Sequence, residues 1–178
     1  MLKSTNKYIG ILGGSFDPPH EGHVKISYVS CKKLKLKKLH WVITKKNPFK
    51  KKSFFSLNER IKKCKKITKK NKKIKIHFLE DKFKSNKTID ILKFFIKKNV
   101  KSNYYLIIGS DNLINFHKWK RWKLILKMCK LVIFSRKGFE KEAKKSQVMK
   151  YLKKKEFIYI KNNKIDISSS QLRKFYLK

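Results

Sequence analysis

The stretch Gly13-Gly14-Ser15-Phe16-Asp17-Pro18-Pro19-His20-Glu21-Gly22-His23 decides how this chain of 178 residues is interpreted. It follows a short apolar segment, Tyr8–Leu12, which is typical of a buried strand. Glycine lets the backbone approach a phosphate closely because it has no Cβ. A helix that begins near Gly22 would present unpaired amide groups and the positive end of its dipole to the same anion. The stretch therefore predicts a strand, a phosphate-binding turn and a helix.

Two histidines stand at the predicted start of that helix. His20 and His23 are three residues apart, so both side chains can point at one phosphate. The spacing of the glycines differs from the dinucleotide fingerprint, and no Gly-Lys-Ser/Thr follows as in a P-loop. An ordinary tight turn with two exposed histidines is the simpler alternative. Two His and one Asp among turn-forming residues, directly after a strand, favour the phosphate site.

Short apolar runs alternate with stretches of helical spacing along the chain. The runs are rich in β-branched and aromatic residues and predict strands at Tyr8–Leu12, Leu39–Ile43, Ile74–Leu79, Tyr104–Ile108, Leu131–Phe134 and Phe157–Ile160. The stretches predict helices at His23–Leu34, Leu57–Ile67, Ile89–Lys98, Trp119–Met128 and Glu140–Leu152, with a short last helix opened by Ser168–Ser170 and running through Phe175. We expect a single α/β domain over residues 1–178, a doubly wound and mostly parallel sheet with helices on both faces.

Further polar segments follow the predicted strands or lie near the end of the chain. Ligands in such folds bind beyond the carboxyl ends of the strands. Gly109 and Asp111 follow a predicted strand and suit an adenosine or ribose contact. Serine hydroxyls at a helix start, with Arg173 one turn later, suit a phosphate clamp, although a serine N-cap would look the same.

These segments resemble a known family. GGSFDPPHEGH resembles the HxGH signature of nucleotidyltransferases in the class I aminoacyl-tRNA synthetase superfamily, and the leading Gly-Gly and His20 resemble bacterial nicotinate-nucleotide adenylyltransferases. Related pantetheine-phosphate adenylyltransferases usually carry Thr where His20 stands. Ile167–Arg173 resembles the ISSTxIR motif, and Ile108–Leu113 with Trp119 resembles the GxDxL…W segment. The resemblance covers Tyr8 to Lys174 and implies a Rossmann-like nucleotidyltransferase fold.

The resemblance implies adenylyl transfer from ATP to nicotinate mononucleotide, a step of NAD biosynthesis. His20, His23 and Arg173 would be catalytic. The implied ATP-binding residues are Gly13, Gly14, Ser15, Phe16, His20, Gly22, His23, Gly109, Asp111, Arg136, Ile167, Ser168, Ser170 and Arg173. Magnesium would come with ATP and be held by phosphates and water, with few or no protein ligands.

The mononucleotide would contact Ser15, Asn47, Thr88 and Trp119. Thr88 is equally suited to capping a helix, and Trp119 to anchoring the core. Two positions depart from the family pattern: Lys87 replaces a Tyr, and Lys120 replaces an aromatic residue that often follows the stacking Trp. Nicotinamide mononucleotide and phosphopantetheine stay open as alternative acceptors.

The composition limits the class of protein. The chain has 50 Lys and Arg against 11 Asp and Glu, a net charge of +39. The excess is spread along the chain and is nearly all Lys, which favours a biased genome composition over a nucleic-acid surface. A basic RNA-binding protein on the same fold remains the alternative, and any binding of polyanions would be non-specific.

No apolar run suits a membrane span, and three scattered cysteines indicate a reducing, cytoplasmic location. We expect a monomer or homodimer.

Overall fold

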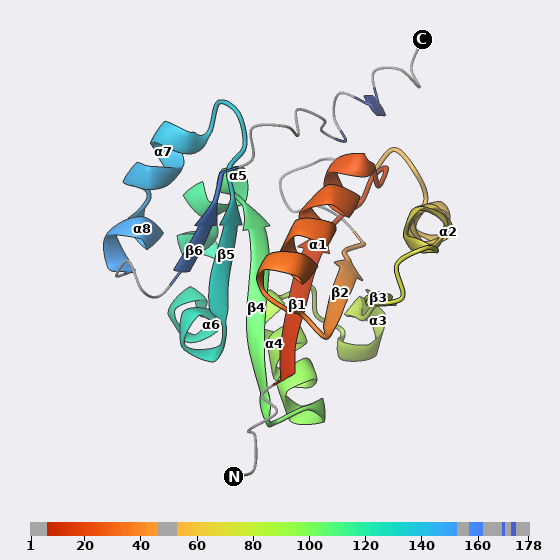
Figure 1. The fold of residues 1–178 in the computed structure, drawn as a ribbon, viewed down its shortest axis with the longest axis horizontal. Coiled ribbons are helices and arrows are strands. Elements are labelled where there is room, and N and C mark those ends of the chain that lie inside the picture. The colour runs from red at the N-terminus through yellow and green to blue at the C-terminus, as the bar shows by residue number, and fades with distance from the viewer. Residues whose placement is uncertain (1–6, 46–52, 153–156, 162–168, 170–171, 174–178) are drawn as a thin grey trace.

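One sheet of six parallel strands carries the fold (Figure 1). It is seen in a computed structural model that describes residues 7–45, 53–152, 157–161, 169 and 172–173. The strand order is β3-β2-β1-β4-β5-β6. The strands are β1 (Lys7–Gly14), β2 (Lys38–Ile43), β3 (Ile74–Phe78), β4 (Ser102–Gly109), β5 (Lys130–Phe134) and β6 (Phe157–Ile160). All six predicted strands and the parallel α/β class are confirmed.

Helices cover both faces because successive strand residues point to opposite sides. On β2, Trp41 packs in the cluster beneath α1 (Glu21–Lys33) and α2 (Leu57–Thr68), whereas Val42 packs in the cluster beneath the opposite helices. That opposite face is covered by α4 (Thr88–Lys98), α5 (Ser110–Ile114), α6 (Trp122–Met128), α7 (Glu140–Lys145) and α8 (Gln147–Tyr151). In Figure 1, α1 lies in front of the sheet and α4 behind it. The remaining elements are α3 (Glu80–Phe83) and the 3-10 helix η1 (Phe116–Lys118).

Two helix predictions were wrong in their extent. The helix expected from Trp119 begins at Trp122, because Arg121 has a left-handed backbone (φ +55°) and residues 116–118 already form η1. The helix expected over Glu140–Leu152 is divided at Ser146, whose backbone is extended and whose hydroxyl caps α8. Of the last predicted helix, Ser169, Leu172 and Arg173 are described and are helical.

The order of the strands defines where a ligand can bind. The connections turn in opposite directions from β1 and β4, so a crevice is expected between the carboxyl ends of these two strands. The turn after β1 and the start of α5 after β4 both lie at that end. The three cysteines are free and buried. Within the described part of the chain, no helix has the length and apolar character needed to cross a membrane.

Candidate active site

The turn after β1 is supported from inside the protein by Phe16. This residue has a left-handed backbone (φ +47°) and is 1% exposed, with its ring stacked on Trp41 at 4.7 Å between centroids. Its side chain therefore supports the turn from inside the protein. Gly13 is exposed, and a Cβ there would meet no described atom within 4 Å. The outer side of the turn is thus open to a ligand.

The side chains of His20 and His23 both accept hydrogen bonds from backbone N–H groups at the start of α1. The backbone N–H of Gly22 donates to His20 Nδ1 (3.1 Å), and that of His20 donates to His23 Nδ1 (3.2 Å). The ring centroids are 3.9 Å apart. A backbone N–H can only donate, so each Nδ1 must be the unprotonated nitrogen. The proton of each neutral ring is therefore on Nε2, which makes both rings hydrogen-bond donors.

Electrostatics keep both rings neutral near pH 7. Burial, aided by the positive charge of Arg136, lowers the pKa of His20 from 6.5 to about 4. Burial lowers the pKa of His23 well below its usual value, and the nearby His20 and Arg136 lower it further. Arg136, which follows β5, therefore acts on both histidines even though the sequence separates them by more than a hundred residues.

Asp111 and Arg136 pair beside the histidines. Arg136 Nη1 lies 2.6 Å from Asp111 Oδ2, and the backbone N–H of Arg136 donates to the buried Ser110 hydroxyl (2.8 Å). Asp111 Oδ1 is buried and has no hydrogen-bond partner among the described residues. A Cβ on Gly109 would collide with this oxygen. The absence of a side chain at 109 therefore lets the carboxylate occupy its position, where it can accept a hydrogen bond.

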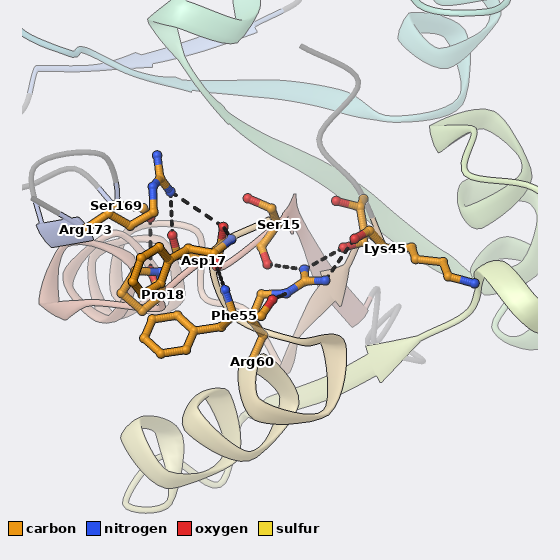
Figure 2. A network of polar contacts seen from close by, with 10 residues as sticks. Ser15, Asp17, Pro18, Lys45, Phe55, Arg60, Ser169 and Arg173 are labelled. Carbon is orange, nitrogen blue, oxygen red and sulfur yellow. Dashed lines mark hydrogen bonds and ion pairs between the residues drawn. The ribbon is translucent and has the colours of Figure 1, made fainter. Parts of the chain in front are cut away.

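Ser169 and Arg173 lie on the turn after β1, as Figure 2 shows. Arg173 Nη1 donates to the Asp17 carbonyl (2.6 Å) and lies 3.7 Å from the Asp17 carboxylate. The Ser169 hydroxyl donates to the Pro18 carbonyl (3.0 Å). Residues more than 150 positions apart in the sequence thus meet at one place. The predicted site residues Asn47, Ile167, Ser168 and Ser170 lie outside the described residues.

The residues expected to hold the mononucleotide lie after β3 and β4. Thr88 is the first residue of α4, and the cap position belongs to Lys87, so Thr88 is not the N-cap. Trp119 ends η1, is partly buried and packs on Phe116 at 4.7 Å between centroids. The nearby side chain of Lys87 and its positive charge are the main causes that lower the pKa of Lys120. The two departures from the family pattern therefore lie next to each other.

The donor set does not form a metal cage. In the part of the chain that the structure describes, no group of three or more His, Cys, Asp or Glu side chains could hold a metal ion. The carboxylates of Asp17 and Asp111 are each paired with an arginine. A metal held by the protein does not fit these side chains.

Sequence reasoning missed two residues of this site. Asp17 lies within the quoted stretch, but no sequence motif indicates its role, and none includes Arg60. Arg60 is almost fully buried on α2 and donates to the Ser15 carbonyl (2.7 Å). The available signal was an arginine in a chain whose basic residues are nearly all lysine.

The fold and the site define a nucleotidyltransferase. The model of the cytidylyltransferase-like family matches residues 11–175, so the chain belongs to that family. The fold is similar to that of Plasmodium falciparum nicotinic acid mononucleotide adenylyltransferase complexed with APC (TM-score 0.74, 24% identity, 96% of this chain and 84% of that chain). The same enzyme complexed with NaAD gives a TM-score of 0.72 at 25% identity, with the same coverage.

A relative in sequence narrows the class. The chain is 50% identical over 173 residues to a probable nicotinate-nucleotide adenylyltransferase of Pelagibacter ubique, covering 97% of this chain and 96% of the relative. The chain belongs to the nicotinate-nucleotide adenylyltransferases.

Proposed function

We propose that this chain transfers the adenylyl group of ATP to nicotinate mononucleotide, yielding nicotinate adenine dinucleotide and pyrophosphate. The observation that carries the proposal is the pair of neutral donors, His20 and His23, at the start of α1 and beside Arg136. The identity of 50% with a relative named for this acceptor supports the choice of the pyridine substrate. The reaction is a step of NAD biosynthesis.

The chemistry is a direct displacement. A phosphate oxygen of the mononucleotide forms a bond to the α-phosphorus of ATP, and the bond from that phosphorus to the oxygen bridging to the β-phosphate breaks. Pyrophosphate leaves with the electron pair. The attacking phosphate is already an anion, so no strong base is required. The protein must align the two substrates and stabilise charge on the phosphate oxygens.

His20 and His23 donate from Nε2 to the α- and β-phosphates in this proposal. Arg136 adds positive charge beside them. Asp17 places Arg173 over the turn. Arg173 and Ser168 both bind the leaving pyrophosphate. The unpaired oxygen of Asp111 accepts a hydrogen bond from a ribose hydroxyl.

The mononucleotide takes the side of the site near α4 and η1, where Thr88 contacts the pyridine carboxylate and Trp119 stacks on the ring. Ser15 and Asn47 complete the acceptor contacts.

Magnesium arrives with ATP and is held by triphosphate oxygens and water. The buried free cysteines support a cytoplasmic location, and one continuous sheet supports a single domain.

A pyrophosphate-release assay tests the function. The purified protein is given ATP with nicotinate mononucleotide, nicotinamide mononucleotide or phosphopantetheine. Release should be fastest with nicotinate mononucleotide. A clear preference for another acceptor would show that the substrate is that acceptor and not nicotinate mononucleotide. If no acceptor gives pyrophosphate and the protein binds RNA in a salt-sensitive manner, the proposed function is wrong and the chain is an RNA-binding protein.

Two substitutions at His23 test the donor role. His23→Asn keeps an oxygen near the position of Nδ1, which can still accept from the His20 backbone, but it removes the donor at Nε2. His23→Gln places an amide N–H near Nε2. We expect His23→Asn to lower kcat by about 100-fold or more, and His23→Gln to retain more activity, with both proteins folded. Near-normal turnover of the Asn variant would disprove this role of His23.

A further inference from the structure

Arg60 is a buried arginine whose hydrogen bonds all go to backbone carbonyls. It lies in the first turn of α2 and is 1% exposed. Its guanidinium joins three segments, as Figure 2 shows: Nε donates to the Phe55 carbonyl (3.2 Å), Nη1 to those of Ser15 (2.7 Å) and Thr44 (2.8 Å), and Nη2 to that of Lys45 (2.8 Å). These carbonyls belong to the turn after β1, to the residues directly after β2, and to the residue before the N-cap of α2.

Packing alone does not explain an arginine at this place. Burial is the main effect on Arg60 and lowers its pKa, against the nearby Asp17, Cys64 and Glu80, which raise it. A buried charge that is matched mainly by carbonyl dipoles is costly, and an apolar side chain would fill the space at lower cost. The rigid planar fork of arginine, however, can bind several fixed carbonyls at once. The need to bind carbonyls of three segments therefore explains why an arginine occupies this buried position.

The joined segments carry both halves of the proposed site. Ser15 belongs to the turn that leads to His20, and the Thr44 backbone N–H donates to the Gly14 carbonyl (2.9 Å). Lys45 stands two positions before Asn47, which the family resemblance implies as a contact of the mononucleotide. Arg60 thus fixes the turn for the ATP phosphates relative to the strand end that leads to the acceptor side.

Asp17 provides a second link between the turn and α2. Its carboxylate accepts hydrogen bonds from the backbone N–H groups of Phe54 (2.8 Å) and Phe55 (2.9 Å). The backbone of Phe55 is therefore bound at its nitrogen by Asp17 and at its oxygen by Arg60. Of these two links, Arg60 is the one that also reaches the residues directly after β2.

We propose that Arg60 is a positioning residue for adenylyl transfer, which aligns the two substrates by holding the turn after β1 at a fixed distance from the end of β2. The proposal rests on the proposed function, because alignment matters only where two substrates react. An error of about 1 Å in such an alignment can cost about 100-fold in rate. The effect should appear in kcat and in the KM for the mononucleotide, more than in the affinity for ATP.

The test compares Arg60→Lys, Arg60→Ala and the control Thr68→Ala. Lysine keeps the charge but lacks the planar fork. Thr68 is buried on the same helix, and its hydroxyl bonds only to the Cys64 carbonyl, so its replacement weakens α2 without touching the turn. Steady-state kinetics, binding of ATP alone and urea unfolding are measured for each protein.

We expect Arg60→Lys to lower kcat by about 100-fold, with ATP affinity changed by less than about threefold. Methylguanidinium added to Arg60→Ala should raise kcat in a saturable manner, whereas Thr68→Ala should keep wild-type kcat and give no such response. Folded Arg60 variants with near wild-type kcat, or a loss that Thr68→Ala reproduces at equal stability, would overturn the proposal. If the wild-type protein releases no pyrophosphate, the proposed function has failed instead.

Discussion

The pair His40–His77 predicts how the stability of this protein depends on pH. His40 Nδ1 and His77 Nε2 are 2.8 Å apart, on the face of the sheet covered by α4. His40 is 7% exposed, and its ring stacks on Phe95 at 4.3 Å between centroids. One imidazole must donate and the other accept, so protonation of the accepting nitrogen breaks the hydrogen bond.

The cost of protonation follows from the surroundings. Burial, then His77 and Lys38, lower the pKa of His40 from 6.5 to about 4, and burial and Lys98 lower that of His77. A lowered pKa means that the folded state binds fewer protons than the unfolded state. The stabilisation is therefore complete above pH 6.5 and is lost as the pH falls toward 4. The limiting loss from His40 is roughly 3 kcal/mol, and about 2 kcal/mol of it falls between pH 7.5 and 5.

Urea unfolding at pH 7.5 and pH 5.0 measures this loss. His40→Asn keeps a polar group near Nδ1 but cannot titrate, and Val42→Ala removes packing from the same face of β2. Between the two pH values, the wild type should lose about 2 kcal/mol more than His40→Asn. Val42→Ala should be less stable at both pH values and keep the wild-type pH dependence. His20 and His23 are present in all three proteins, so their contribution cancels in the comparison.

An equal loss in the wild type and His40→Asn would refute this reasoning. It would mean that the buried pair takes up a proton as readily as an exposed histidine. If Val42→Ala also changes the pH dependence of the free energy of unfolding, that dependence arises from weaker packing of the face beneath α4 and not from the histidine pair.

Three further substitutions test the site and its support. Gly109→Ala should raise the KM for ATP about tenfold, because the new Cβ displaces Asp111; circular dichroism checks that the fold is kept. Asp17→Asn should lower kcat/KM about tenfold, because it loses the charge facing Arg173 and one of two backbone hydrogen bonds; unchanged kinetics would contradict this role. Trp41→Phe should lower the free energy of unfolding by about 2 kcal/mol, measured in urea, because it removes a buried hydrogen bond to a serine hydroxyl on α1 and leaves a cavity.

The sequence predicted the strands because their short runs are apolar, and the runs of β1, β2, β4 and β5 are buried on both faces. It assigned Arg173 to the same phosphate site as the turn after β1, and the structure places Arg173 against Asp17 of that turn. It did not predict the left-handed residue Arg121, because side-chain periodicity contains no signal for a single backbone dihedral. The role of Asp17 was missed because its backbone partners lie 37 and 38 residues away and become neighbours only in the folded chain.

The distribution of arginine separates the site from the general charge of the chain. Only four of the 50 basic residues are arginine. Three of these four are at the turn after β1 or beside it: Arg60 binds its backbone, Arg173 pairs with Asp17, and Arg136 acts on both histidines. Each uses a planar group that binds several acceptors or a carboxylate, which a lysine ammonium cannot replace. Lysine is thus used throughout the chain except where the geometry of the contacts requires arginine. For this reason the high net charge says little about function, whereas the few arginines indicate where the site lies.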